Sequence, residues 1–445
     1  VENKCREWHR QIEMTRRDFR SENSGDDNPA IDDAKRVRLT LLSDVARHGA
    51  SILMTAGYKL KVVRYAEDEY DKRVNGYKPG STITIRKPAQ FTVRSGATAS
   101  SQDVTEGTTT LVVNNQRGVD FEFTSTELTL SIGELSERVI KPAMIRLANE
   151  VDSSIQALYK NVWNWVGTPG QTVNSYSDFT VGPQRLDEMA VPTDERCSTL
   201  APADWWAMSS SLANLTAQST TAETALRKAR LGMLGNVDTY MTQNVQTHTV
   251  GLKGGTPLVN GAAQQTTYAA SKDTNTQSLI TDGWTNSVVA LEAGDVFTIA
   301  GVYAVNPVTK AVLPYLQQFV NTAQATANGS GQVTLTISPA IITSGAYQNV
   351  SAGPADNAAM TVLGTASTGY VQNMVFHKNA FALAMVPMEA PQGAVNVSRK
   401  SMNGLNVRVV PFYDGTNDIS KWRLDILYGV KAINPHYAAR LSGAA

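Results

Sequence analysis

Three short runs in the first third of the chain alternate apolar or β-branched side chains with polar ones. They are residues 81–86 (STITIR), 109–114 (TTLVVN) and 118–124 (GVDFEFT). Period-two alternation of this kind is typical of pleated strands. Residues 94–103, between the first two runs, are too polar and too small to fold on themselves. We therefore expect an extended β-hairpin within residues 75–130, with too little core of its own to hold it in one place.

A helical period follows the hairpin directly. Ser131 and Glu134 form a capping box, in which each side chain can accept the other residue's backbone N–H. Apolar residues then recur mostly three or four positions apart, at Leu135, Val139, Ile140, Met144, Leu147, Val151, Ile155, Leu158 and Val162. We expect one amphipathic helix over about residues 132–165, roughly 50 Å long at about 1.5 Å per residue and bent by Pro142.

A change of composition marks residues 252–370 as an insertion. Few charges occur over residues 253–375, namely Lys253, Lys272, Lys310, Asp273, Asp282, Glu292, Asp295 and Asp356. Short β runs at 287–291, 296–303 and 332–337 are separated by turn residues at about ten-residue spacing. This pattern predicts a small barrel or sandwich.

The segments before the hairpin and after the helix are less regular. Residues 1–30 mix charges densely and suggest a mobile arm or an isolated helix, and residues 31–56 have helical spacing. Residues 183–250 alternate helical runs with loops; residues 221–231 are one expected helix, and residues 236–251 an extended exit from a domain.

Strand patterns return after the insertion. Long apolar strands are expected over residues 375–385 and 405–410, and an alternating sheet strand over residues 422–430. Residues 435–445 are expected to form a small, weakly structured end. The whole pattern predicts an α+β fold.

Composition narrows the function. The chain has 445 residues, enough for two or three domains, and its 40 basic and 40 acidic residues give no net charge. That balance argues against a dedicated nucleic-acid-binding protein, which carries a basic excess. Cys5 and Cys197 provide neither a disulfide framework nor metal spacing, so a reducing compartment is the simpler interpretation. The sequence shows no signal-peptide pattern and no apolar run long enough to span a bilayer.

No arrangement of residues points to catalysis or to a cofactor. The histidines are scattered without metal-ligand spacing, at His9, His48, His248, His377 and His436. Phosphate-binding loops, nucleophile elbows and dinucleotide fingerprints are missing from the sequence. The acidic cluster over residues 67–71 is either a solvated face or a weak cation site. We therefore expect a protein that is not an enzyme, with no catalytic, cofactor-binding or metal residues.

The hairpin and the helix carry the candidate subunit contacts. Arg86, Lys87 and Arg94 lie on the hairpin, and Glu134 and Glu137 lie at the start of the helix. The basic side chains can pair with acids of a neighbouring copy, or they can be ordinary solvated residues. Single exposed pairs contribute little, but a repeated contact could matter collectively.

Four segments in order resemble one protein family. They are GSTITIRKP (80–88), QDVT (102–105), GVDF (118–121) and SERVIKP (136–142). Together they resemble the major capsid (coat) proteins of tailed bacteriophages, in the branch of short-tailed enterobacterial phages with an inserted β domain. GDVFTIAGV (294–302) resembles a stretch of that inserted domain. The similarity extends over about residues 60–440.

The resemblance implies the Hong Kong 97-type phage capsid fold with an inserted small β-barrel domain. The implied division is an N-terminal arm (1–74), an extended loop (75–130), a peripheral domain with the spine helix (131–182), an axial domain (183–251), the inserted β domain (252–370), and a second axial and peripheral part (371–445).

The resemblance also implies a function. A capsid protein self-assembles as hexamers and pentamers into the icosahedral head shell of a tailed bacteriophage, in the host bacterial cytoplasm. Its implied partners are copies of itself, a scaffolding protein, a portal and packaged double-stranded DNA bound without sequence specificity, with no membrane. A secreted or surface-displayed β-rich adhesin is the competing interpretation, since the Thr- and Asn-rich region 252–370 suits it.

Overall fold

The structure is a computed structural model of the whole chain. It describes residues 61–62, 82–94, 96–97, 101–124, 139–215, 231–391, 397–402 and 405–444. The expected N-terminal arm and helix (1–56), the acidic cluster at 67–71, the capping box at 131–134 and most of the expected helix at 221–231 lie outside these residues.

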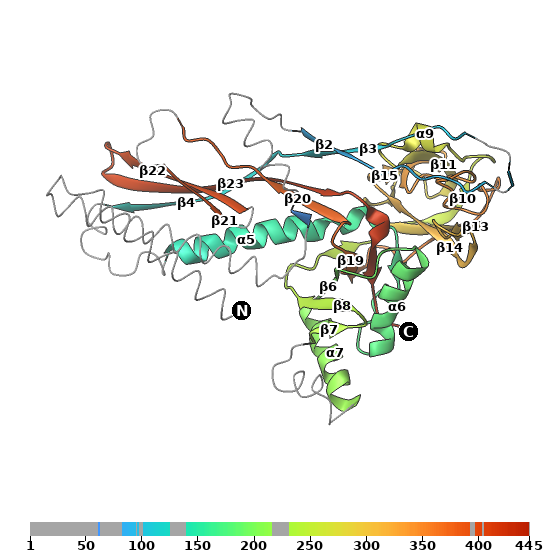
Figure 1. Cartoon of the computed structure of the whole chain (residues 1–445), viewed down its shortest axis with the longest axis horizontal. Coiled ribbons are helices and arrows are strands. Elements are labelled where there is room, and N and C mark those ends of the chain that lie inside the picture. The colour runs from blue at the N-terminus through green and yellow to red at the C-terminus, as the bar shows by residue number, and fades with distance from the viewer. Residues whose placement is uncertain are drawn as a thin grey trace.

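One long sheet and one helix form the elongated part of the molecule (Figure 1). The sheet runs in the order β1 (Lys61–Val62), β20 (Phe381–Met385), β23 (Ile419–Ala432), β22 (Leu405–Asp414) and β21 (Ser398–Met402), with β4 (Asn115–Thr124) also paired to β23. Helix α5 (Lys141–Gln156) lies along one face of it. The expected strands at 118–124 and 422–430 are confirmed, and they pair with each other.

The apolar stripe of α5 forms a core with this sheet. Met144, Leu147, Val151 and Ile155 are buried against sheet residues that include Leu424, Ile426 and Tyr428. The expected helix is too long at its C-terminal end. After Gln156 the chain continues as a 3-10 helix (η3, Ala157–Asn161), and residues 165–166 form strand β5 (Trp165–Val166). Pro142 lies in the first turn of α5, where a missing N–H is tolerated.

A second six-stranded sheet lies beyond the C-terminal end of α5. Its order is β5, β24 (Ala438–Leu441), β19 (Asn373–His377), β6 (Arg196–Leu200), β8 (Val237–Met241) and β7 (Met233–Leu234). Helices α6 (Tyr176–Glu188) and α7 (Pro202–Leu215) accompany it. The expectation of a weakly structured end at 435–445 is wrong. After a short turn, η4 (Pro435–Tyr437), β24 is fully buried between β5 and β19.

The apolar run at 375–385 is likewise two strands and not one. The backbone turns at residues 378–380, so β19 belongs to the second sheet and β20 to the first. Residues 236–251 contain β8 and a short strand, β9 (Thr247–Thr249), which pairs with β18 (Gly369–Val371).

The low-charge segment forms a third, β-rich unit, on the right in Figure 1. Its main sheet runs in the order β10 (Gly255–Val259), β11 (Gln277–Trp284), β16 (Val333–Ser338), β14 (Val312–Asn321), β13 (Val296–Val305) and β17 (Met360–Val362). A second ladder joins β12 (Val289–Leu291) to β15 (Ala325–Thr326), and α9 (Tyr268–Ser271) is one turn of helix. Its core also takes in Trp163, Trp165 and Tyr370.

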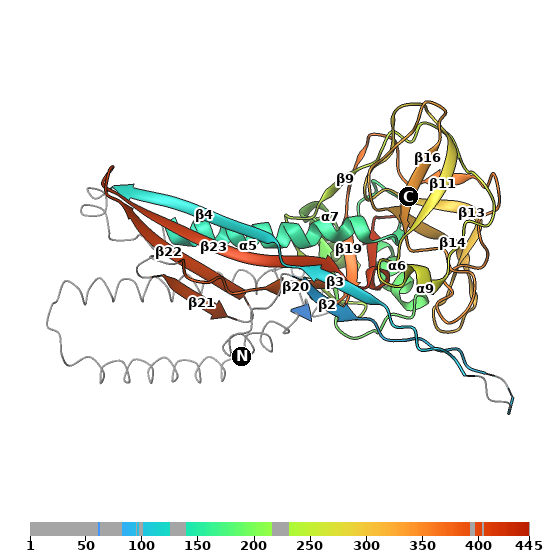
Figure 2. The same ribbon diagram turned by 90° about the horizontal axis from the view of Figure 1, so that it is seen from above.

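The hairpin is formed by β2 (Thr82–Arg86) and β3 (Thr108–Val112). They pair antiparallel from Thr82 opposite Val112 to Arg86 opposite Thr108, as expected. Beyond this ladder the two arms run past the β-rich unit and project from the molecule (Figure 2).

Candidate functional site

The base of the hairpin is anchored in the chain's own core. Ile83 and Leu111 are buried and pack in a cluster with Ala382 and Ala384 of β20. A Cβ atom at Gly429 of β23 would lie 2.3 Å from the carbonyl oxygen of Val112. Glycine is therefore required where β3 crosses β23, and the ladder of the hairpin sits firmly on the first sheet.

The three basic residues that the sequence singled out lie in different surroundings. Arg86 is exposed and pairs with Glu106 of the same hairpin, with 3.8 Å between Nη1 and Oε2. Arg94 is also exposed, and its guanidinium donates to the carbonyl oxygen of Gly96 in the same loop. Glu134 and Glu137 lie outside the described residues, so their proposed pairing stays a prediction.

Lys87 faces the β-rich unit of its own chain. Its Nζ donates to the backbone carbonyl oxygen of Lys272, 3.1 Å away. Burial lowers the pKa of Lys87, and the nearby Asp273 carboxylate works in the opposite direction. The side chain is thus already engaged within its own subunit.

Asp273 binds the returning arm of the hairpin. Its Oδ1 accepts the backbone N–H of Thr108 at 2.8 Å and the Thr108 hydroxyl at 2.9 Å. These hydrogen bonds from Thr108 hold the pKa of Asp273 below its usual value.

Tyr347 contacts both arms. Its hydroxyl accepts the backbone N–H of Gln90 at 2.9 Å and donates to the carbonyl oxygen of Thr105 at 3.1 Å. Its ring stacks on Tyr268 with 4° between the ring planes. Sequence reasoning missed both tyrosines. Lys272 and Asp273 stood out only as rare charges in a low-charge segment, with no signal for what they contact.

The part of the hairpin beyond these contacts exposes large apolar side chains. Phe91 is 59% exposed, Val93 99% and Val104 59%. A hairpin arm with this much unburied apolar surface is typical of a segment that packs on a partner.

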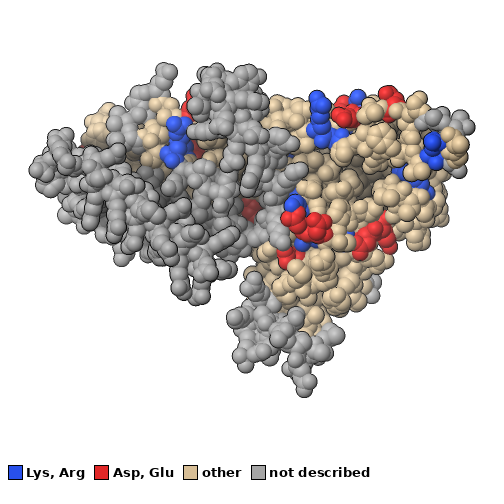
Figure 3. Space-filling model, viewed as in Figure 1, with Lys and Arg blue, Asp and Glu red and all other residues tan. Residues whose placement is uncertain are grey.

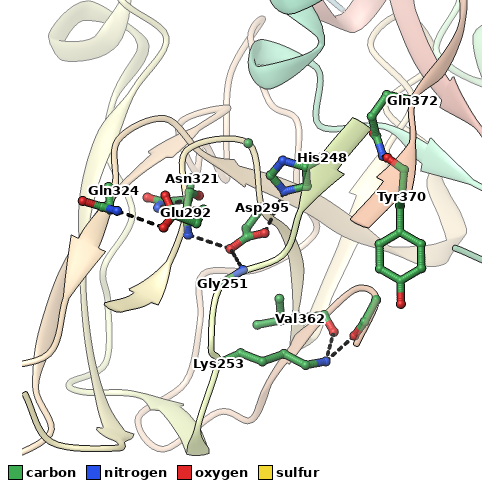
Figure 4. Close-up of polar contacts among 12 residues, drawn as sticks. His248, Gly251, Lys253, Glu292, Asp295, Asn321, Gln324, Val362, Tyr370 and Gln372 are labelled. Atoms are coloured by element: carbon green, nitrogen blue, oxygen red, sulfur yellow. Dashed lines mark hydrogen bonds and ion pairs between the residues drawn. The ribbon is translucent and has the colours of Figure 1, made fainter. Parts of the chain in front are cut away.

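A second polar cluster joins the β-rich unit to the rest of the chain (Figure 4). His248 of β9 and Asp295, next to β13, are both buried, with 2.8 Å between Nε2 and Oδ1. Asp295 Oδ2 also accepts the backbone N–H groups of Gly251 at 3.0 Å and Glu292 at 2.7 Å. The hydroxyl of Tyr159 lies 3.2 Å from the other ring nitrogen of His248. Both ring nitrogens of His248 and both carboxylate oxygens of Asp295 therefore have hydrogen-bond partners inside the chain.

Arg440 of β24 extends this junction. It is fully buried, and its Nη1 donates to the carbonyl oxygen of Gly294 at 2.8 Å. Its guanidinium carbon lies 5.1 Å from the centre of the Tyr159 ring and 5.6 Å from that of Trp165. Burial lowers the pKa of Arg440 to about 9. The C-terminal strand thus fixes the β-rich unit through a buried cation.

One group of described residues has the spacing of cation ligands. Asp194, Glu195 and His377 place a ligand atom each within 4.8 Å of one another. His377 Nδ1, however, accepts the N–H of Asn379, so its Nε2 carries the proton in the neutral ring. Glu195 is paired with Lys378. Since two of the three groups are engaged within the chain, we assign them no ligand.

The described surface carries mixed charge. On the face shown in Figure 3, basic and acidic side chains form small separate groups on a mainly uncharged background. Within the described ranges, the helices are all too short or too polar to cross a membrane.

Comparison with known proteins identifies relatives over most of the chain. A family model described as "P22 coat protein - gene protein 5" matches residues 61–443. The major capsid protein of Acyrthosiphon pisum secondary endosymbiont phage 1 is 21% identical over 383 residues, which cover 82% of this chain and 89% of that protein.

Solved structures of phage proteins are similar as well. A chain from Mycobacterium phage Che8 matches with a TM-score of 0.43 and 11% identity, over 84% of this chain and 87% of its own length. The CUS-3 coat protein I-domain is 29% identical and matches over 25% of this chain and 98% of its own length, with a TM-score of 0.19. The family model and the curated relative decide the assignment. The chain belongs to the P22 coat protein family, and it is a major capsid protein of a tailed bacteriophage.

Proposed function

We propose that this chain is the repeating subunit of an icosahedral head shell that encloses double-stranded DNA. In this proposal the chain has a Hong Kong 97-type fold. The long sheet with α5 is the peripheral domain, the second sheet with α6 and α7 is the axial domain, and the β-rich unit at 252–370 is an inserted domain. The mixed helix and strand content and the projecting hairpin support this division.

The observation that carries the proposal is the projecting hairpin. Phe91, Val93 and Val104 are exposed although the base of the same hairpin is buried in the core. In a monomer these apolar side chains stay exposed to water, which is unfavourable. They become buried only when another copy covers the arm. Because every subunit carries the same arm, the contact repeats around each hexamer and pentamer.

The remaining partners follow from the family. A scaffolding protein and a portal belong to the proposed assembly pathway, which takes place in the host bacterial cytoplasm. DNA is held without sequence-specific binding, in keeping with zero net charge. Membership of a structural capsid family supports no enzymatic role, and the competing adhesin interpretation finds no support in the relatives.

Expression of the full chain, alone and with the scaffolding protein of its phage, tests the proposal. We expect closed shells or tubular polyheads by negative-stain electron microscopy, and a fast-sedimenting species by ultracentrifugation. A chain that stays monomeric in both cases, with a folded circular dichroism spectrum, would overturn the proposed assembly. The variant Val93→Asp places a charge on the exposed arm and should reduce assembly without unfolding the subunit, with Val308→Asp on the β-rich unit as the matched exposed control.

A further inference from the structure

We propose that the inserted β-rich unit binds the hairpin of its own subunit through a polar clasp formed by Tyr347, Tyr268, Asp273 and the Lys272 carbonyl, which sets the direction of the hairpin before a neighbouring subunit arrives. This inference rests on the proposed function, because the direction of the hairpin matters only in assembly. It replaces the expectation that the hairpin of an isolated subunit has too little core to be held in one place.

The first support is that a single hydroxyl links the two arms beyond their ladder. The last paired residues are Arg86 and Thr108. Past them, the Tyr347 hydroxyl accepts from Gln90 on the outgoing arm and donates to Thr105 on the returning arm. Both the donor and the acceptor capacity of the hydroxyl are used, so sideways movement of either arm breaks a hydrogen bond.

The second support comes from the adjoining contacts at α9. Asp273 accepts both the N–H and the hydroxyl of Thr108, and Lys87 donates to the Lys272 carbonyl. Hydrogen bonds to a carboxylate are stronger than those between neutral groups. These contacts hold the arms at the point where the ladder ends, and Tyr347 holds them further out.

The third support is the close fit of Gly107. A Cβ atom at this position would lie 2.5 Å from the Lys272 carbonyl oxygen and 2.8 Å from the Tyr268 hydroxyl. Gly107 is buried, although it lies on a projecting arm. Burial also raises the pKa of Tyr268. The arm is therefore packed closely against the unit at Gly107.

The consequence concerns how the exposed apolar residues are presented. Phe91 directly follows Gln90, Val93 lies two residues beyond Phe91, and Val104 directly precedes Thr105, so the clasp holds the chain on both sides of the apolar tip. A segment held in its bound direction loses less conformational freedom when a partner binds, which favours association. We therefore assign Tyr347 and Asp273 as positioning residues for assembly.

Hydrogen exchange of the full-length, unassembled subunit tests the clasp. The Gln90 and Thr108 amides donate to Tyr347 and Asp273, so their exchange reports on the clasp directly. In the double variant Tyr347→Phe/Asp273→Ala, we expect peptides covering 88–108 to exchange roughly tenfold faster, the change that a lost stabilisation of about 1.4 kcal/mol produces. Peptides from β11 and β16 should be unchanged, which shows that the unit itself remains folded.

Two further variants make the test sharper. Gly107→Ala should also speed up hydrogen exchange in the peptides covering 88–108, because the added Cβ would clash with the Lys272 carbonyl oxygen. Both clasp side chains remain in place in this variant. Tyr303→Phe is the matched control, because it removes a tyrosine hydroxyl from an exposed position of the same unit and should change nothing at 88–108.

The outcomes separate this inference from the proposed function. Unprotected exchange at 88–108 in the unaltered subunit, or identical protection in the double variant, would overturn the clasp whatever the chain assembles into. Loosened exchange with an unchanged rate of shell formation, followed by light scattering, would overturn its role in assembly. Failure of the unaltered chain to form shells would instead count against the proposed function and leave the exchange result standing.

Discussion

Nε2 of His248 lies 2.8 Å from Oδ1 of Asp295, and both side chains are buried at the junction between the β-rich unit and the rest of the subunit. In Figure 4 the two side chains face each other, with the Gly251 amide on the other side of the carboxylate. A buried acceptor with three donors around it makes the junction sensitive to a single substitution.

Asp295→Ala should therefore lower the free energy of unfolding by about 3 kcal/mol, since it leaves His248 and the amides of Gly251 and Glu292 without their acceptor. Urea denaturation followed by circular dichroism measures the change. Asp282→Ala on β11 is the control, and it should cost less than about 0.5 kcal/mol. Equal stability of the two variants would contradict the assignment of Asp295 as the link.

The β-rich unit should fold by itself, and its melting temperature should depend on where the fragment begins and ends. A fragment of residues 252–370 should give a β-type circular dichroism spectrum and melt cooperatively, because most of its core is internal. A fragment of residues 247–371 should melt several degrees higher, since it adds the β9–β18 ladder and Val250.

The comparison of the two fragments checks both statements. A disordered spectrum for both would remove the idea of an independent insertion. Equal melting temperatures would mean that the β9–β18 ladder belongs to the rest of the subunit.

Local patterns predicted the strands well wherever alternation and β-branching agree. In residues 422–430 the apolar positions alternate in the sequence, although Asp425 between Leu424 and Ile426 is buried as well and pairs with Arg408 and Arg423. Residues 82–86 have one buried face, so their period of two is visible in the sequence. The apolar face of α5 was predictable for the same reason. Leu147 and Val151 are buried where the helical period places them.

Other features depend on contacts that no local pattern carries. Ala438 and Ala439 have weak strand propensity, and β24 forms because β5 and β19 offer it two edges in a buried sheet. The junction of His248 with Asp295, and the clasp of Tyr347 with the hairpin, join residues far apart in sequence. Their side chains look like ordinary polar residues until the fold brings them together.

Helix α5 allows a test of the core that it forms with the first sheet. Leu147→Asp places an unpaired charge against Leu424 and Ile426 and should cost several kcal/mol, leaving little soluble protein. Ile145→Asp is the matched control on the same helix, because Ile145 is 37% exposed. Expression yield and urea midpoints compare the two. Soluble, assembly-competent Leu147→Asp protein would show that this face is not buried.

Stability should fall as pH decreases from about 7 to about 5. Burial lowers the pKa of His436 to about 4, and burial also lowers the pKa of His377. An unfolded histidine titrates near 6.5. Below that pH these histidines are protonated in the unfolded chain but stay neutral in the native state, so the free energy of unfolding decreases.

Urea midpoints at pH 7.5 and pH 5 measure this effect, and the double variant His436→Gln/His377→Gln should flatten the dependence. Hydrogen bonding and the Lys421 pair lower the pKa of Asp414 to about 2, so its contribution is lost only below about pH 4 and falls outside this window. If the urea midpoint of the double variant still falls steeply between pH 7.5 and pH 5, the effect comes from other titratable groups.

The basic residues of the hairpin give the last test, and they fall into two groups. Arg86 and Arg94 are exposed, whereas Lys87 is bound within its own subunit. Arg86→Glu/Arg94→Glu should leave the monomer folded, because both side chains are exposed and neither contacts the core. If these charges meet acids of a neighbouring copy, shell formation followed by light scattering should slow roughly tenfold at low salt, and the difference should shrink as salt is added.

Lys87→Glu should behave differently. It removes the hydrogen bond to the Lys272 carbonyl and brings a carboxylate toward Asp273, so it should loosen the hairpin even in the monomer. The exchanged pair Arg86→Glu/Glu106→Lys separates the remaining possibilities, because it preserves an ion pair within the hairpin while reversing Arg86. If Arg86 meets a neighbour, this exchange should still slow assembly. Restored assembly would mean that Arg86 acts only on Glu106, and that the contact between subunits depends on the apolar tip.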